Sequence, residues 1–288
     1  MNTLKTTVLM ALLMGIMIAV GGAFGGRGGA MLMLIISLGF NFVTYWFSDS
    51  IVLKMYDARE VDGHSAPELY GLVERLAANA ELPMPRVYIV NSGAPNAFAT
   101  GRNPSHAAVA VTTGLMNTLD YEEIGGVLAH ELSHVKHRDT LISCVAAAMA
   151  GVISTIANIA QWAAIFGVGR SDDDDNGGFL GMIVTIVIAP IAAALIQMAI
   201  SRSREYDADK AGGQICGNPN ALANALEKIE YYSLHGPTLA NSTTSTAHMC
   251  IINPLAGSKQ TFINLFSTHP PTQERIARLR QQALAMGK

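Results

Sequence analysis

Four long stretches of the chain carry no charged residue and are dominated by apolar side chains. They cover residues 6–26, 28–48, 140–169 and 176–201. About 20 apolar residues at a helical rise of about 1.5 Å cross the hydrocarbon core of a bilayer, so each stretch is long enough to span it. The pattern predicts two transmembrane hairpins, residues 6–48 and 140–201, which together make a four-helix bundle.

The first stretch has a second interpretation, because a cleaved signal peptide is also apolar and N-terminal. Its apolar run exceeds the usual length of about 7–15 residues, and no plain small-residue cleavage site precedes a polar region. The sequence GGAFGGRGG around Arg27 instead predicts a turn between two spans, and its glycine spacing allows helices to approach closely. We therefore expect an uncleaved hairpin.

Two polar blocks remain, residues 51–139 and 202–288. The first block mixes the periodicities of helices and strands. Its predicted elements are a helix over residues 66–82, strands over 85–90 and 106–114, and a second helix over 119–137. Asp120 is expected to cap this second helix, with Glu123 completing a capping box.

The second polar block is helical throughout. Its predicted helices cover residues 203–213, 218–232 and 269–284. The chain is therefore expected to be mainly α with a small β-sheet. We expect a single domain in two halves, 51–139 and 202–288, which the second hairpin interrupts.

Composition agrees with a membrane protein. Half of the residues are hydrophobic, only 14% are charged and the mean hydropathy is +0.30, whereas soluble domains carry about 25% charged residues. The net charge of −3 offers no basic excess, so we expect no nucleic-acid partner. Three scattered cysteines make no disulfide framework and are typical of a reducing compartment.

Lysine and arginine near the ends of the apolar stretches predict the orientation, because these residues gather on the cytoplasmic side. One side carries Lys5, Lys54, Arg59, Lys136, Arg138, Arg202 and Arg204. The other side carries only Arg27 and Arg170. Both termini and both polar blocks are therefore expected in the cytoplasm, with the acidic loop 172–175 outside.

The sequence HELSH at residues 130–134 has the spacing of a metal site. His130 and His134 are four apart, so on a helix they share one face and can bind one Zn²⁺. Glu131 points about 100° away, where it can reach a metal-bound water and act as general base. This pattern predicts hydrolysis without a covalent intermediate.

A catalytic zinc needs a third protein ligand and an open position. His137 lies about 10.5 Å along the helix from His130, too far for the same ion. Glu205 follows the second hairpin, which returns the chain to the same membrane face, and Asp209 lies one helical turn later. From the residues alone, Glu205 is either the third ligand or a surface partner of neighbouring arginines.

Three motifs in this order carry a resemblance to a known family: HELSH, then SRSREYDAD after a membrane hairpin, then THPPTQERI. Together they resemble the HtpX-type membrane zinc metalloproteases, relatives of the CaaX prenyl proteases. The resemblance implies a zincin-like metalloprotease domain interrupted by, and anchored on, the four-helix bundle. It also implies one Zn²⁺ per chain on His130, His134 and Glu205, with Glu131 as general base. Asp209 would accept a hydrogen bond from one of the zinc-bound histidines.

The resemblance assigns four further residues. Asn96 and Ala97, in NAFATG, resemble a segment over the cleft, where an edge strand can pair with extended substrate; composition alone favours an ordinary edge strand. His269 and Arg275, in HPPTQER, resemble a C-terminal pair near the active site, where a cation can stabilise an oxyanion. Without the family they would be a helix-cap neighbour and a surface charge.

The expected function is hydrolysis of peptide bonds in membrane or membrane-proximal proteins, bound in extended form. The resemblance implies quality control and stress response in a bacterial-type cytoplasmic (inner) membrane, and leaves the oligomeric state open. We expect the catalytic helix to run into the third apolar stretch. Charges at Lys136, Arg138 and Asp139 oppose a site buried among the spans. A catalytically silent metal-binding membrane scaffold, in which Glu131 is dispensable, is the alternative.

Overall fold

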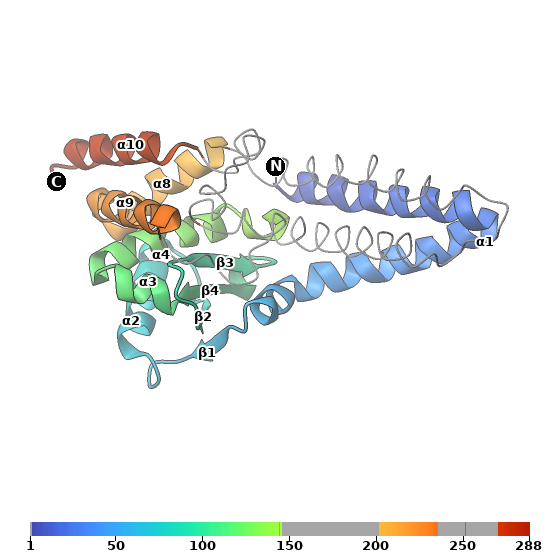
Figure 1. Ribbon diagram of the computed structural model, residues 1–288, viewed down its shortest axis with the longest axis horizontal. Coiled ribbons are helices and arrows are strands. Elements are labelled where there is room, and N and C mark those ends of the chain that lie inside the picture. Colours follow the sequence, from blue (N-terminus) through green and yellow to red (C-terminus); the bar gives the residue numbers. More distant parts are fainter. Residues whose placement is uncertain (1, 144, 146–201, 236–250, 252–269) are drawn as a thin grey trace.

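The computed structural model describes residues 2–143, 145, 202–235, 251 and 270–288. A long helical arm, α1 (Asn2–Met55), extends from a body that contains one sheet and the remaining helices (Figure 1). The third and fourth apolar stretches lie outside the described residues, except for the start of the third. The fold is mainly α with one small mixed sheet, as expected.

Helix α1 is two antiparallel helices joined at Gly26. Gly26 has φ 56° and ψ −142°, a conformation open to glycine but not to residues with a Cβ. These two helices lie side by side, since Asn41 Nδ2 of the second helix donates to the Met10 carbonyl of the first over 3.3 Å. Of the described helices, Gly25–Met55 is long and apolar enough to cross a membrane, and Thr6–Ala19 is a shorter apolar helix.

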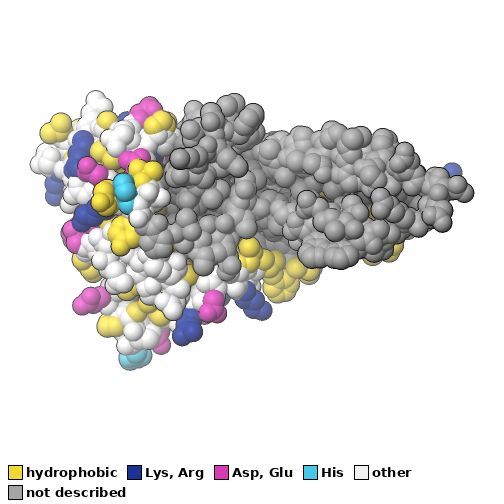
Figure 2. All heavy atoms as spheres, in the orientation of Figure 1, with side chains coloured by type: hydrophobic (Ala, Val, Ile, Leu, Met, Phe, Trp, Pro, Cys, Tyr) yellow, Lys and Arg dark blue, Asp and Glu magenta, His cyan; other side chains and the backbone are white. Residues whose placement is uncertain are grey.

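The surface of α1 differs from that of the body. Large apolar side chains in the part of α1 that follows Gly26 face outward, including Ile35 (62% exposed) and Phe42 (59% exposed). Figure 2 shows charged side chains on the body and apolar ones where the described part of α1 is visible. Exposed apolar surface of this extent marks a membrane or protein contact.

The sheet has four strands in the order β1-β2-β4-β3. The strands are β1 (Arg59–Val61), β2 (Arg86–Val90), β3 (Ala97–Gly101) and β4 (Ala107–Thr112). β2 and β4 are parallel, while β1 and β3 pair antiparallel with their neighbours. Strands β2 and β4 confirm the expected strands at 85–90 and 106–114; the three-residue β1 was not predicted.

The two faces of the sheet pack against different helices. On one face, Phe98 and Ala110 pack with Val52, Leu53 and Tyr56 at the end of α1. On the other face, alanine and valine side chains join the main core with α2 (Pro67–Asn79) and α4 (Tyr121–Lys136). The C-terminal end of α1 therefore packs directly on the sheet.

Helix α4 lies at the centre of the body. Asp120 and Glu123 form the expected capping box at its start. The other described helices are α3 (Thr113–Thr118), α8 (Arg202–Cys216), α9 (Pro219–His235) and α10 (Thr272–Ala285). α8 crosses α4 closely at Gly212, where a Cβ would lie 2.9 Å from the His130 backbone. Glycine at this point brings the side chains of α8 within reach of the α4 histidines.

Candidate metal centre

His130 and His134 turn their Nε2 atoms toward one another from α4. The two Nε2 atoms are 3.2 Å apart, and the rings are nearly perpendicular, at 87°. This follows from their four-residue spacing, which places both side chains on one helix face. His130 is buried and His134 is partly exposed, so the pair opens to one side.

Glu205 on α8 completes a three-ligand group. Its carboxylate oxygens lie 3.8 Å from His130 Nε2 and 3.6 Å from His134 Nε2. Ligands at about 2.0–2.1 Å from a tetrahedral zinc are separated by about 3.4 Å, so the donor set fits zinc in both type and spacing. Glu205 is only 8% exposed, which argues against the alternative of a solvated surface ion pair.

Each histidine has a carboxylate behind its other ring nitrogen. Asp209 Oδ1 lies 3.0 Å from His130 Nδ1, and Asp139 Oδ2 lies 3.2 Å from His134 Nδ1. A carboxylate only accepts, so each contact favours a proton on Nδ1, which leaves Nε2 as the nitrogen that can bind a metal once the ring is neutral. The structure therefore places Asp209 where the sequence interpretation expected it and adds Asp139, which was missed.

Arg275 lies behind Asp209. Its Nε and Nη2 each donate to the Asp209 carboxylate over 2.7 Å, and its Nη1 donates to the Ile251 carbonyl over 2.9 Å. Burial acts to raise the pKa of Asp209, but the charge and hydrogen bonds of Arg275, together with His130, hold that pKa below its usual value. Asp209 is therefore an anion facing His130. The predicted contact of Arg275 with a substrate oxyanion stays a prediction.

Glu131 is held by the edge of the sheet. The Ala99 backbone N–H donates to Glu131 Oε2 over 2.9 Å, and the side chain is buried. Burial raises the pKa of Glu131, with the neighbouring histidine charges opposing the shift. A raised pKa moves a carboxylate toward the range in which it exchanges protons near neutral pH.

Metal and proton compete for His134. Burial lowers its pKa, but the hydrogen bond to Asp139 and the charges of Glu205 and Glu131 prevail and raise the pKa to about 9. The ring is therefore protonated at neutral pH unless a cation displaces the proton. Carboxylates that surround an imidazole stabilise any positive charge on or beside the ring, whether a proton or a metal ion.

The catalytic helix does not run unbroken into the third apolar stretch, so that expectation was wrong. α4 ends at Lys136, Arg138 adopts a left-handed φ of 58°, and helix resumes at Thr140. The break turns Asp139 back toward His134, which a continuous helix would prevent. His137 caps the end of α4 and is exposed.

The remaining predicted residues have different placements. Asn96 is buried, and its Oδ1 accepts the Ile251 backbone N–H over 3.2 Å. Ala97 opens β3 and is fully buried. Their contact with substrate stays a prediction. His269 lies outside the described residues.

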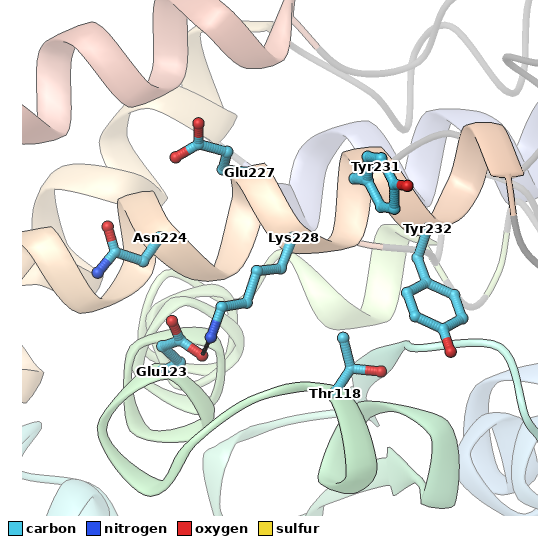
Figure 3. A pocket seen from close by; sticks show the side chains of 7 residues that line it. All are labelled: Thr118, Glu123, Asn224, Glu227, Lys228, Tyr231 and Tyr232. Atoms are coloured by element: carbon cyan, nitrogen blue, oxygen red, sulfur yellow. Dashed lines mark hydrogen bonds and ion pairs between the residues drawn. The ribbon is translucent and has the colours of Figure 1, made fainter.

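A hollow of about 730 Å³ lies apart from these ligands, between α9 and the start of α4. Lys228 reaches across it from α9 to Glu123 over 2.6 Å (Figure 3). Because Glu123 also belongs to the capping box, this contact ties α9 to the first turn of α4. We assign the hollow no chemistry.

Comparisons with known proteins find a family and several relatives that cover most of the chain. Residues 64–283 match the model of Peptidase family M48. A protein of Desulfatibacillum aliphaticivorans named "Protease HtpX homolog" is 55% identical over 279 residues, which cover 96% of this chain and 89% of the relative. A protein of the same name from Thermococcus kodakarensis is 54% identical over 284 residues, 99% of this chain and 97% of the relative.

One solved structure is similar in fold. The crystal structure of S. mikatae Ste24p has a TM-score of 0.50 and 17% sequence identity, and the match covers 96% of this chain. This chain spans 65% of the length of that protein. At this identity the likeness supports the fold alone.

Proposed function

This chain belongs to peptidase family M48 and is a metallopeptidase, and from that premise we propose that it is a membrane-anchored zinc endopeptidase. Membership in the family confirms the resemblance to HtpX-type proteases and favours an enzyme over the silent scaffold. In the proposed centre His130, His134 and Glu205 hold one Zn²⁺, and Glu131 is the general base. The convergence of three ligand atoms within 4.8 Å, from two helices on either side of a long insertion, carries the proposal.

A bound zinc ion supplies an acidic water and an electrophile for the substrate carbonyl. Glu131 takes a proton on a carboxylate oxygen and later delivers it to the departing amine. Its Oε2 is fixed by the Ala99 N–H, which leaves Oε1 for this transfer. Asp209 and Asp139 keep the histidine rings oriented with Nε2 toward the ion.

The substrate is proposed to bind in extended form along β3. Among the strands that the structure describes, β3 lies at the sheet edge and beside α4. A strand added there pairs with main-chain groups of β3 other than the Ala99 N–H, which holds Glu131, and brings its peptide bonds past Glu131. The predicted contacts of Asn96 and Ala97 with substrate belong to this mode of binding.

We extend the proposal to a multi-pass protein of a bacterial-type cytoplasmic membrane, with the body and both termini inside. The apolar surface of α1 and the bias of lysine and arginine support this placement. Damaged or misfolded membrane proteins are the proposed substrates, in quality control.

The test uses the full chain in detergent or proteoliposomes with a membrane-anchored protein substrate. Zinc-loaded wild type is expected to cleave, to stop after chelation and to recover when zinc is restored. Glu131→Gln is expected to lose activity by at least about 100-fold, since general base catalysis contributes about 10²–10⁴-fold. The matched control, Glu122→Gln, changes an exposed neighbour in the same helix. Cleavage by Glu131→Gln at the wild-type rate would contradict the proposal.

A further inference from the structure

The C-terminal end of β3 is bound to the membrane arm. The Arg102 guanidinium lies 4.7 Å from the centre of the Trp46 ring, and its Nη1 donates to the Trp46 carbonyl over 3.4 Å. Arg102 directly follows Gly101, the last residue of β3. The C-terminal end of β3 is therefore held against α1 at Trp46.

That turn of α1 has the features of a membrane–water boundary. Phe42, Trp46 and Phe47 are 59%, 45% and 50% exposed, and aromatic side chains gather at the bilayer interface. The helix becomes irregular at Phe47, which has φ −117° and ψ 16°. Two residues later, Asp49 pairs with Arg86 of β2, so polar interactions with the sheet begin where the exposed apolar surface ends.

The first residue of the third apolar stretch contacts the same end of β3. Thr140 is the first residue of the third apolar stretch, and its hydroxyl donates to the Gly101 carbonyl over 2.9 Å. Asp139, one residue earlier, contacts His134. Trp46 of α1 and Thr140, which are far apart in the sequence, therefore contact neighbouring residues at this end of β3.

The distance from this boundary to the reacting position is short. The alternation of an antiparallel edge directs the main chain of residues 97, 99 and 101 away from β4. This agrees with the contacts of Ala99 N–H with Glu131 and of Gly101 C=O with Thr140. From Ala99 to Arg102 is three residues, or about 10 Å of strand.

Building on the proposed function, we infer that the enzyme measures its cleavage site from the membrane. A chain anchored in the bilayer enters beside Trp46, pairs with β3 and presents to Glu131 a peptide bond about three to six residues from the membrane surface. The substrate class is thus extended juxtamembrane segments, selected by distance from the bilayer and not by a sequence motif.

The test is a series of single-span reporters in proteoliposomes with the zinc-loaded full chain. Zero to twelve residues are inserted between the membrane anchor and one fixed sequence, and the anchor is placed before that sequence in one set and after it in another. Mass spectrometry of the products locates each cut. We expect the cut to stay about three to six residues from the anchor in all cleaved members.

Two results would overturn the inference while leaving the peptidase intact. One is a cut that follows the fixed sequence through the insertions. The other is an Arg102→Gln variant that keeps the wild-type positions, where we expect a shift of one residue or more. Arg75→Gln, which removes another arginine that lies over an aromatic ring, Tyr121, is the matched control and is expected to cut as wild type. Cleavage of no reporter by wild type would instead overturn the proposed function as well.

Discussion

Replacing Arg275 with glutamine tests how the centre is supported from behind. Arg275 is 1% exposed and gives two hydrogen bonds to Asp209 and one to the Ile251 carbonyl. The variant leaves the Asp209 carboxylate buried without its counter-charge. Breaking one side of a buried ion pair costs about 3–5 kcal/mol, so we expect the free energy of unfolding to fall by about that amount.

The same change should weaken the metal site. Without Arg275 the pKa of Asp209 rises, because burial then acts unopposed by that charge. Asp209 loses its hold on His130 Nδ1, and loss of such a partner lowers metal affinity by about 10–100-fold. Zinc affinity is measured by competition with a chelator, and stability by denaturant unfolding of the purified full chain in detergent.

The controls separate the buried pair from general damage to α10. Arg278→Gln removes an exposed arginine of the same helix, whose ion pair with Glu274 and contact with the Tyr206 ring are together worth about 1 kcal/mol. The double variant Arg275→Gln, Asp209→Asn removes both charges of this pair and should recover part of the lost stability. The reasoning is refuted if Arg275→Gln matches Arg278→Gln in both stability and zinc affinity.

Three further predictions follow from the site and its helix. Asp139→Asn is expected to lower zinc affinity by about 10–100-fold, since it weakens the orientation of His134, and it also removes the charge that faces Arg204 over 3.5 Å; unchanged chelator competition would contradict this. Because the metal-free pKa of His134 is about 9 and zinc must displace its proton, zinc affinity should rise about tenfold per pH unit from about pH 6.5 to 8. The stability of the metal-free form should fall as the pH rises from about 6.5 to about 9, because the unfolded ring gives up its proton at a lower pH than the folded one; affinity independent of pH would speak against it. Asp120→Ala removes the cap of α4 and should cost about 0.5–2 kcal/mol in denaturant unfolding, with an unchanged midpoint as the contrary result.

Local patterns predicted the elements that form from local interactions. The capping box at Asp120, the four-residue spacing of the histidines and the short apolar runs of β2 and β4 all depend on nearby residues. The three-residue β1 and the six-residue α3 were missed, because such short elements carry too few residues for a period to show. Their formation depends on packing against the sheet.

The supporting residues of the centre could be predicted only in part. Asp209 was found because it lies one helical turn after Glu205. Asp139 was missed because its approach to His134 requires Arg138 to adopt a left-handed conformation. Such a conformation is usually indicated by glycine, and this position is an arginine. The bond of Arg275 to Asp209 joins residues 66 apart, a pairing that no local spacing indicates.

The position of the bound ion tests the central claim most directly. Zinc-edge anomalous scattering from crystals of the zinc-loaded chain locates the metal independently of its coordinates. We expect one peak per chain about 2.0–2.1 Å from Nε2 of His130 and His134 and about 2.0–2.2 Å from a Glu205 oxygen. A peak away from these three residues, or Glu205 turned away from a metal held by the two histidines, would contradict the account.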